Sequence, residues 1–178
     1  MTEVLRADAV VVGAGTSGCY FAWRLGQAGF RTLILDKLAL DQVGQVIDIF
    51  HMDEVRFDQF ELEHPSGDEL LGHYPSGLAW SPDLEVRNRV NYAFYVMHKP
   101  SFCQRMHRLA RAAGAQILEG VEVSAPIVDD GFVVGVRASR DGQPLEVRGR
   151  IVVDASGIEA LTVIPVRPGD VKHMLVSP

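Results

Sequence analysis

The sequence predicts an α/β fold, in which helices cover a parallel β-sheet and a three-stranded antiparallel meander is added. The first observation is an apolar run at residues 9–12 that leads directly into the segment GAGTSG at residues 13–18. The second is a helical pattern that returns to another apolar run, which ends on Asp36. The third is a set of strand-like segments between residues 121 and 147, joined by Asp-Gly pairs. A strand, a helix and a strand in this short succession predict parallel strands with a right-handed crossover.

The elements of this first βαβ unit have recognisable limits. Residues 4–12 are predicted to form one strand, residues 16–28 the helix and residues 31–35 the second strand. Gly29 follows the helix at the position where glycine commonly ends one, because glycine adopts the left-handed conformation without strain.

Each glycine of the GAGTSG segment meets a physical requirement of dinucleotide binding. Gly13 permits the tight turn from strand to helix, Gly15 lets a pyrophosphate approach the backbone, and Gly18 lets the helix pack closely on the strand. The N–H groups of the first helical turn face the phosphate, where the helix dipole favours negative charge. The segment therefore predicts a Rossmann-like site for a ligand that contains ADP.

Asp36 lies at the end of the second strand, about 20 residues after the glycines, where an acidic side chain accepts hydrogen bonds from a ribose diol. A carboxylate there also disfavours a 2′-phosphate, so NADP is expected to fit poorly. From this segment alone, NAD and FAD remain equally good ligands.

The pattern is looser over residues 38–94. Short strands are expected near Val55, near Phe57 and at residues 60–62, separated by turns rich in proline and glycine. We interpret the segment as an insertion, part of a layer that faces substrate, rather than as a separate domain.

Helical periodicity returns at residues 100–113 and ends at Gly114. One face of this helix is apolar and the arginines lie largely elsewhere, so we expect the arginines to form a solvated face. The apolar positions are Phe102, Met106, Leu109 and Ala110, and the arginines are Arg105, Arg108 and Arg111.

Strands fill the rest of the predicted fold. A strand begins at Ile117, and the meander follows, with Asp130-Gly131 and Asp141-Gly142 as its hairpin turns. The meander strands are expected at residues 121–128, 132–138 and 145–147. Residues 151–153 form a short β-branched strand typical of the middle of a sheet, and the small-residue turn Asp154-Ala155-Ser156-Gly157 follows it.

Composition excludes several classes of function. A net charge of −6 with no basic stripe argues against nucleic-acid binding, and no apolar stretch reaches the roughly 20 residues of a membrane span. The N-terminus lacks the pattern of a signal peptide. Only two cysteines are present, without a CxxC motif, which predicts a reducing, cytoplasmic location. The six histidines have no metal-ligand spacing, so no metal site is expected.

Four segments, in this order, resemble the FAD-dependent oxidoreductases of the p-hydroxybenzoate hydroxylase and geranylgeranyl reductase group. They are GAGTSG with Asp36-Lys37, residues 95–102 leading through an alanine-rich helix to Gly114, Gly120-Val121-Glu122-Val123, and residues 149–157 with their DASG turn. The resemblance covers most of residues 4–160. The meander is the feature that separates such FAD domains from simple NAD dehydrogenases.

The resemblance implies a role for eleven residues in holding FAD. Lys99 stands where the family usually has arginine, so it keeps the charge but loses the bidentate geometry. No catalytic residue is identified. The implied contacts are Gly13, Ala14, Gly15, Ser17 and Gly18 at the pyrophosphate, Asp36 at the ribose, Lys37 beside the adenine, Lys99 near the flavin, the main chain of Val123 at the adenine, and Ala155 and Gly157 where the backbone passes the cofactor.

The family also has a Gly-Asp pair far downstream and a second sheet that covers the flavin ring. Gly169-Asp170 follows Gly157 too closely to be that pair. We therefore expect an FAD-binding domain at residues 1–160, an irregular tail at residues 161–178, and a fold that is incomplete relative to the family.

The first functional hypothesis is an FAD-dependent oxidoreductase or its amino-terminal portion, with NAD(P)H as electron donor and a hydrophobic small molecule that is hydroxylated or reduced. Catalysis is expected if a downstream half, a partner chain or an oligomer completes the flavin site. The alternative is a non-catalytic dinucleotide-binding module or split subunit. An NAD-dependent dehydrogenase is a third hypothesis, which the meander and the DASG turn disfavour.

Overall fold

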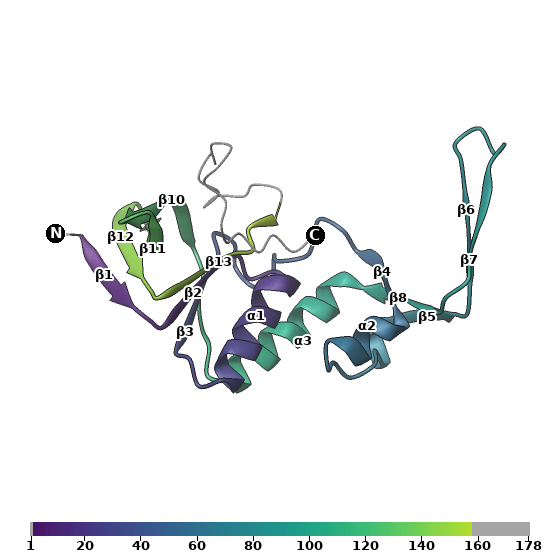
Figure 1. Cartoon of the computed structure of the whole chain (residues 1–178), viewed down its shortest axis with the longest axis horizontal. Helices are drawn as coiled ribbons and strands as arrows, with labels where there is room; N and C mark the ends of the chain where they lie inside the picture. Colours follow the sequence, from purple (N-terminus) through teal and green to yellow (C-terminus); the bar gives the residue numbers. More distant parts are fainter. Residues whose placement is uncertain (1, 158–178) are drawn as a thin grey trace. The chain divides into compact units, whose positions relative to one another are not determined.

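The computed structural model describes residues 2–157 of the 178-residue chain, so the predicted tail and Gly169-Asp170 lie outside the described residues. Two compact units make up the chain (Figure 1). Among the described residues, the first unit contains residues 2–40 and 106–157, and the second unit contains residues 41–105. The segment that we interpret as an insertion falls largely within the second unit.

A four-stranded parallel sheet is the centre of the first unit, with the strand order β13-β2-β3-β9. Helix α1 connects β2 to β3, and helix α3 precedes β9, as the sequence predicts. The elements are β2 (Ala9–Val12), α1 (Thr16–Gln27), β3 (Thr32–Leu35), α3 (Lys99–Ala112), β9 (Gln116–Leu118) and β13 (Ile151–Asp154). This arrangement confirms the α/β fold class.

The meander forms a second sheet in the same unit, with the order β1-β12-β11-β10. Its strands are β1 (Glu3–Arg6), β10 (Val121–Asp129), β11 (Phe132–Arg140) and β12 (Gln143–Arg148). Asp130 and Gly131 both have positive φ, at 46° and 80°, as a two-residue hairpin turn whose twist matches the strands requires. The predicted three-stranded meander is confirmed.

The prediction of one strand over residues 4–12 is wrong. The segment forms two strands, β1 and β2, which belong to different sheets. The break lies at Asp8, where the N–H groups of Asp8 and Ala9 both donate to the Arg31 carbonyl, and the Asp8 carboxylate accepts from the Arg31 N–H at 2.9 Å. These contacts come from a residue 23 positions away, so no local turn signal announces the break.

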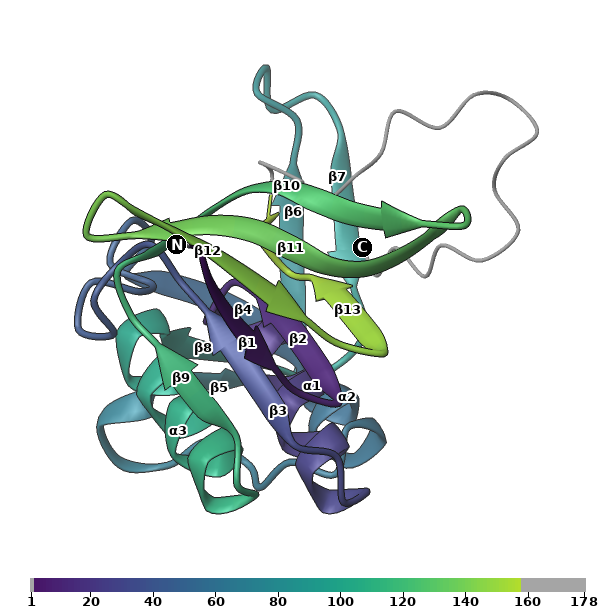
Figure 2. The ribbon, with the colours of Figure 1, turned by 90° about the vertical axis from the view of Figure 1, so that its left-hand side faces the viewer.

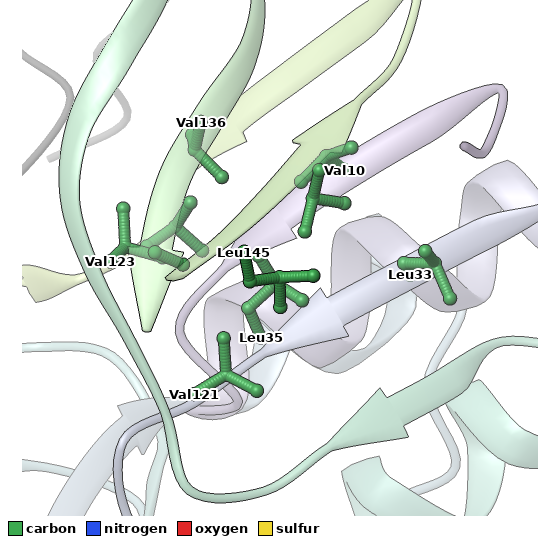
Figure 3. Packing of buried hydrophobic residues seen from close by; sticks show 10 residues of the cluster. Val10, Leu33, Leu35, Val121, Val123, Val136 and Leu145 are labelled. Atoms are coloured by element: carbon green, nitrogen blue, oxygen red, sulfur yellow. The ribbon is translucent and has the colours of Figure 1, made fainter. Parts of the chain in front are cut away.

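One hydrophobic core joins the two sheets of the first unit (Figure 3). Alternate residues of β2 and β3 point into it, because side chains alternate across a strand. The buried members are Val10, Val12, Leu33, Leu35, Val121, Val123, Val136, Ala138, Leu145 and Val147. Helix α1 lies on the other face of the parallel sheet (Figure 2), where a Cβ on Gly18 would come within 3.2 Å of the Val11 side chain.

The second unit contains a three-stranded antiparallel sheet and a separate hairpin. The sheet has the order β4-β8-β5, and the hairpin pairs β6 with β7. Its elements are β4 (Ile49–Asp53), α2 (Glu54–Gln59), a short 3-10 helix (Gly67–Glu69), β5 (Leu70–Tyr74), β6 (Gly77–Trp80), β7 (Arg87–Val90), β8 (Phe94–His98) and the beginning of α3.

The strands expected near Val55 and Phe57 and at residues 60–62 do not form, because this segment is helix α2 and its C-terminal cap. The Leu62 N–H donates to the Phe57 carbonyl, and Glu61 has φ 54°, which is typical of a helix that ends in a left-handed residue. Phe57 and Leu62 are buried, whereas Val55 and Phe60 are exposed. The alternating apolar residues therefore belong to a short helix with one buried side chain, Phe57, and to the buried Leu62 that follows its cap.

Candidate dinucleotide-binding site

Three turns meet at the carboxyl ends of adjacent parallel strands in the first unit. The GAGTSG turn follows β2, Asp36 follows β3 and the DASG turn follows β13. The Gly13 N–H donates to the Leu35 carbonyl, and the Ala155 N–H donates to the Val12 carbonyl, each at 2.8 Å. Ligands of open α/β sheets bind outside the carboxyl ends of the strands, so the structure brings these predicted segments together at one edge.

Gly13 and Gly18 are required by the fold itself. A Cβ on Gly13, where φ is +100°, would lie 2.4 Å from the Ala155 carbonyl oxygen. A Cβ on Gly18 would lie 2.0 Å from the Gly13 carbonyl oxygen. The first contact fixes the two turns against each other, and the second lets α1 begin directly beneath the turn.

Gly15 differs from its two neighbours in the motif. Its backbone, with φ −66° and ψ −179°, is open to any residue. A Cβ built on Gly15 would have no described atom within 4 Å. Nothing in residues 2–157 therefore requires glycine here, and the space in front of Gly15 suits a ligand that approaches the backbone closely.

The N-terminus of α1 faces the same region. The first hydrogen bond of the helix runs from the Cys19 N–H to the Gly15 carbonyl at 3.0 Å. The N–H groups of Ser17 and Gly18 precede that bond, so the helix's own carbonyls do not serve them. Ser17 is exposed, as an anion-binding helix terminus requires.

The Asp36 carboxylate braces the turn and retains acceptor capacity. Its Oδ2 accepts from the Ala14 N–H at 2.6 Å, and its Oδ1 accepts from the Leu38 N–H at 2.8 Å. An ionised carboxylate has about four lone-pair sites. Each oxygen therefore retains one acceptor site.

Both polar atoms of the Ala14 backbone are engaged by the protein. Besides the bond from its N–H to Asp36, its carbonyl accepts from His107 Nε2 at 2.8 Å and from the Cys19 thiol at 3.3 Å. The predicted contact of Ala14 with phosphate would compete with Asp36 for the same N–H. Sequence reasoning missed His107, although a polar residue next to Met106 on an apolar helix face is a detectable signal.

The segment before the meander encloses the backbone of Asp36. The Asp36 N–H donates to the Leu118 carbonyl at 3.0 Å, and the Val121 N–H donates to the Asp36 carbonyl at 2.9 Å. Two residues further on, the Val123 side chain is buried in the core, so only its main chain is available to a ligand. Lys37 is exposed beside this segment.

The DASG turn is held by its own acidic residue. Asp154 Oδ1 accepts from the Ser156 N–H at 3.0 Å and from the Ser156 hydroxyl at 2.6 Å. Gly157 is exposed and has φ +76°, and Ala155 presents its carbonyl to Gly13.

Lys99 lies in the second unit, as the first residue of α3. Its N–H donates to the Asp48 carbonyl at 2.7 Å, and its ammonium group lies 4.7 Å from the centre of the Phe50 ring. A cation at this distance over an aromatic face is attracted by the ring.

The second unit also contains a polar cluster that the sequence did not reveal. Tyr95, which is buried, donates from its hydroxyl to Glu54 at 2.9 Å and contacts His64 Nδ1 at 2.9 Å. His64 Nε2 contacts Asp58 at 3.2 Å, and the His73 ring stacks on Tyr95. The hydrogen bond from Tyr95 lowers the pKa of Glu54 below its usual value, and His73 adds to the effect. Within residues 2–157 no group of three or more histidine, cysteine or acidic side chains is arranged to hold a metal.

Two family profiles match the sequence. The NAD(P)-binding Rossmann-like domain matches residues 11–63, and the tryptophan halogenase family matches residues 79–176, which is more than half of the chain.

Two curated relatives are digeranylgeranylglycerophospholipid reductases. The digeranylgeranylglycerophospholipid reductase of Sulfolobus acidocaldarius is 26% identical over 155 residues, which cover 86% of this chain and 34% of that protein. Digeranylgeranylglycerophospholipid reductase 1 of Methanopyrus kandleri is 31% identical over 162 residues, which cover 88% of this chain and 41% of that protein. The chain thus spans less than half the length of these relatives.

Solved structures share the fold. A geranylgeranyl bacteriochlorophyll reductase-like protein from Thermoplasma acidophilum superposes with a TM-score of 0.74 at 18% identity, over 90% of this chain and 44% of that chain. These matches confirm the resemblance drawn from the order of the motifs. The chain belongs to the tryptophan halogenase family, within the FAD-dependent oxidoreductases of the p-hydroxybenzoate hydroxylase and geranylgeranyl reductase group, and it represents their amino-terminal, FAD-binding part.

Proposed function

We propose that the chain holds the ADP portion of FAD at the carboxyl edge of the parallel sheet, for an enzyme that acts on a hydrophobic substrate. The observation that carries this proposal is that no atom of residues 2–157 occupies the space in front of Gly15, at the N-terminus of α1. Flavin, when bound, supplies the redox chemistry, and the protein supplies binding and orientation.

Different residues would contact different parts of the ligand. The first-turn N–H groups of Ser17 and Gly18 would face the pyrophosphate, together with the Gly15 backbone. Asp36 would accept from the ribose hydroxyls through its two remaining lone-pair sites, beside Lys37 and the main chain of Val123 at the adenine. Ala155 and Gly157 would line the path of the cofactor. Lys99 is proposed near the flavin.

The substrate class is also a proposal. The named curated relatives are digeranylgeranylglycerophospholipid reductases, which supports a lipid substrate that is reduced. NAD(P)H as the electron donor is a separate part of the proposal. A partner chain or oligomer that completes the flavin site is a further proposal.

The cofactor proposal is tested on the purified chain by visible spectroscopy, mass analysis of any released cofactor, and calorimetric titration with FAD and ADP. We expect flavin absorbance or reconstitution with FAD. Binding of ADP or NAD without any binding of FAD would favour the alternative, a dinucleotide-binding module without flavin.

Two glycine variants distinguish a glycine that ligand binding requires from a glycine that the fold requires. Gly15→Ala is expected to weaken ADP and FAD binding at least tenfold, while the free energy of unfolding changes by less than about 0.5 kcal/mol. Gly29→Ala is the control, because Gly29 has φ +84° at the far end of α1. It should destabilise the chain by about 1 kcal/mol and leave nucleotide affinity unchanged. Undiminished binding by Gly15→Ala would contradict the proposed site.

Asp36 gives a second test at the adenosine end. A 2′-phosphate beside the carboxylate would meet repulsion between like charges, so ADP should bind at least tenfold more tightly than its 2′-phosphorylated form. Equal affinities, measured by calorimetry at one ionic strength, would show that Asp36 does not meet the ribose.

A further inference from the structure

His107 is a buried histidine that the proposed function does not yet use. It lies on α3 within the first unit, has only 5% of its surface exposed, and directs Nε2 at the Ala14 carbonyl across 93 positions of sequence. A carbonyl oxygen accepts and does not donate, so the Nε2 atom must carry the proton of this hydrogen bond.

The bond fixes the orientation of a peptide group at the candidate site. The Ala14–Gly15 peptide is trans, and in a trans peptide the N–H points opposite to the C=O. Because the Ala14 carbonyl points towards buried His107, the Gly15 N–H points away from it. A Cβ built on Gly15 would also have no atom of residues 2–157 within 4 Å.

We propose that His107 is a positioning residue of the phosphate-binding turn, which holds the Gly15 N–H towards the ligand by anchoring the Ala14 carbonyl. The inference rests on the proposed function for the identity of the ligand. Asp36 holds the N–H of Ala14 and the Cys19 thiol contributes a weaker donor to the same carbonyl, so the peptides on both sides of Ala14 are fixed before a ligand arrives.

Burial assists this role. It lowers the pKa of His107 below the usual range, and the positive charge of Arg111 acts in the same direction. The hydrogen bond that His107 donates to the Ala14 carbonyl and the negative charges of Asp36 and Glu119 act in the opposite direction. The imidazole is therefore neutral at pH 7, with its single proton on Nε2.

The tautomer provides a test that needs no variant. In the wild-type chain, long-range ¹H–¹⁵N correlation of the His107 ring at pH 7.5 should show Nε2 protonated and Nδ1 bare. A ring protonated on Nδ1 alone would overturn the proposal, whether or not the chain binds FAD.

Variants test the consequence for binding. His107→Leu should shift the Gly15 amide ¹⁵N resonance and weaken ADP binding about five- to tenfold, because the carbonyl loses its main donor. His107→Gln, whose Nε2 can reach the same carbonyl, should restore the affinity to within about twofold. Met106→Leu is the packing control, since Met106 is equally buried on the same helix.

Two results would overturn the role. One is equal weakening by His107→Gln and His107→Leu, which would mean that the ring acts through packing alone. The other is an unchanged Gly15 resonance and unchanged ADP affinity in His107→Leu. If the wild-type chain binds no nucleotide at all, the proposed function fails, while the tautomer and the Gly15 resonance still decide whether His107 fixes the turn.

Discussion

The Ala14–Gly15 peptide group shows how single residues prepare the candidate site. On one side, the Ala14 carbonyl has buried donors from His107 and Cys19. At Gly15, no described atom lies within 4 Å of the place that a Cβ would take. The motif alone predicted the glycines and Asp36, because their roles follow from backbone geometry. It did not predict His107, whose partner is distant in sequence.

His107 makes the stability of the chain depend on pH. Its pKa is lower in the folded state than the usual value of about 6.5, so the unfolded chain binds the extra proton first as the pH falls. The stabilisation is therefore fully present above about pH 6.5 and is lost as the pH falls towards the folded-state pKa. Urea unfolding between pH 8 and 5.5 should show a steeper loss for wild type than for His107→Gln. Parallel curves for the two proteins would contradict this assignment.

Among the secondary-structure elements, helix α3 shows what periodicity predicts and what it omits. Phe102, Met106 and Ala110 are buried, as the apolar face predicts. The expectation that the arginines form a solvated face is wrong for Arg105, which lies 2.8 Å from Glu69 and donates to the Glu63 carbonyl at 2.6 Å. Periodicity tells which side of a helix a residue occupies, but the partner opposite Arg105 comes from a separate segment of the second unit.

The Arg105–Glu69 pair should stabilise the second unit measurably. The two side chains are 14% and 9% exposed, so loss of the arginine removes an ion pair from a buried carboxylate. Arg105→Met is expected to lower the free energy of unfolding by about 3 kcal/mol, as measured by urea denaturation. Arg108→Met, on the exposed side of the same helix, should change it by less than about 0.5 kcal/mol. Equal effects of the two variants would contradict a buried ion pair.

At the scale of the whole molecule, the first unit depends on one core that two sheets share. Val10 and Leu35 from the parallel sheet and Val136 and Leu145 from the meander belong to the same buried cluster (Figure 3). The strand before the GAGTSG turn and the strand before Asp36 therefore rely on common packing. None of the helices within residues 2–157 is long and apolar enough to cross a membrane.

Leu145→Ala should consequently destabilise both sheets together. Removal of a buried leucine side chain leaves a cavity, and we expect a loss of about 3 kcal/mol in the free energy of unfolding. Amide hydrogen exchange should accelerate in β2 and β3 as well as in β11. Phe132→Ala, at a position that is 71% exposed, should change neither quantity appreciably. Acceleration confined to the meander would show that the two sheets do not share one core.

The sequence by itself determined the βαβ unit, the meander, the glycine turn and Asp36, because each depends on local rules: periodicity, positive φ in turns, and close approach of backbone. Only the tertiary structure decided the break between β1 and β2, the helical state of residues 54–59 and the burial of Arg105. It also showed that the fold requires Gly13 and Gly18 for steric reasons but not Gly15, and that His107 donates a hydrogen bond to the Ala14 carbonyl. The strand break, the burial of Arg105 and the bond from His107 depend on contacts between residues far apart in the chain, and the freedom of Gly15 depends on the space around it. A local sequence pattern contains neither kind of information.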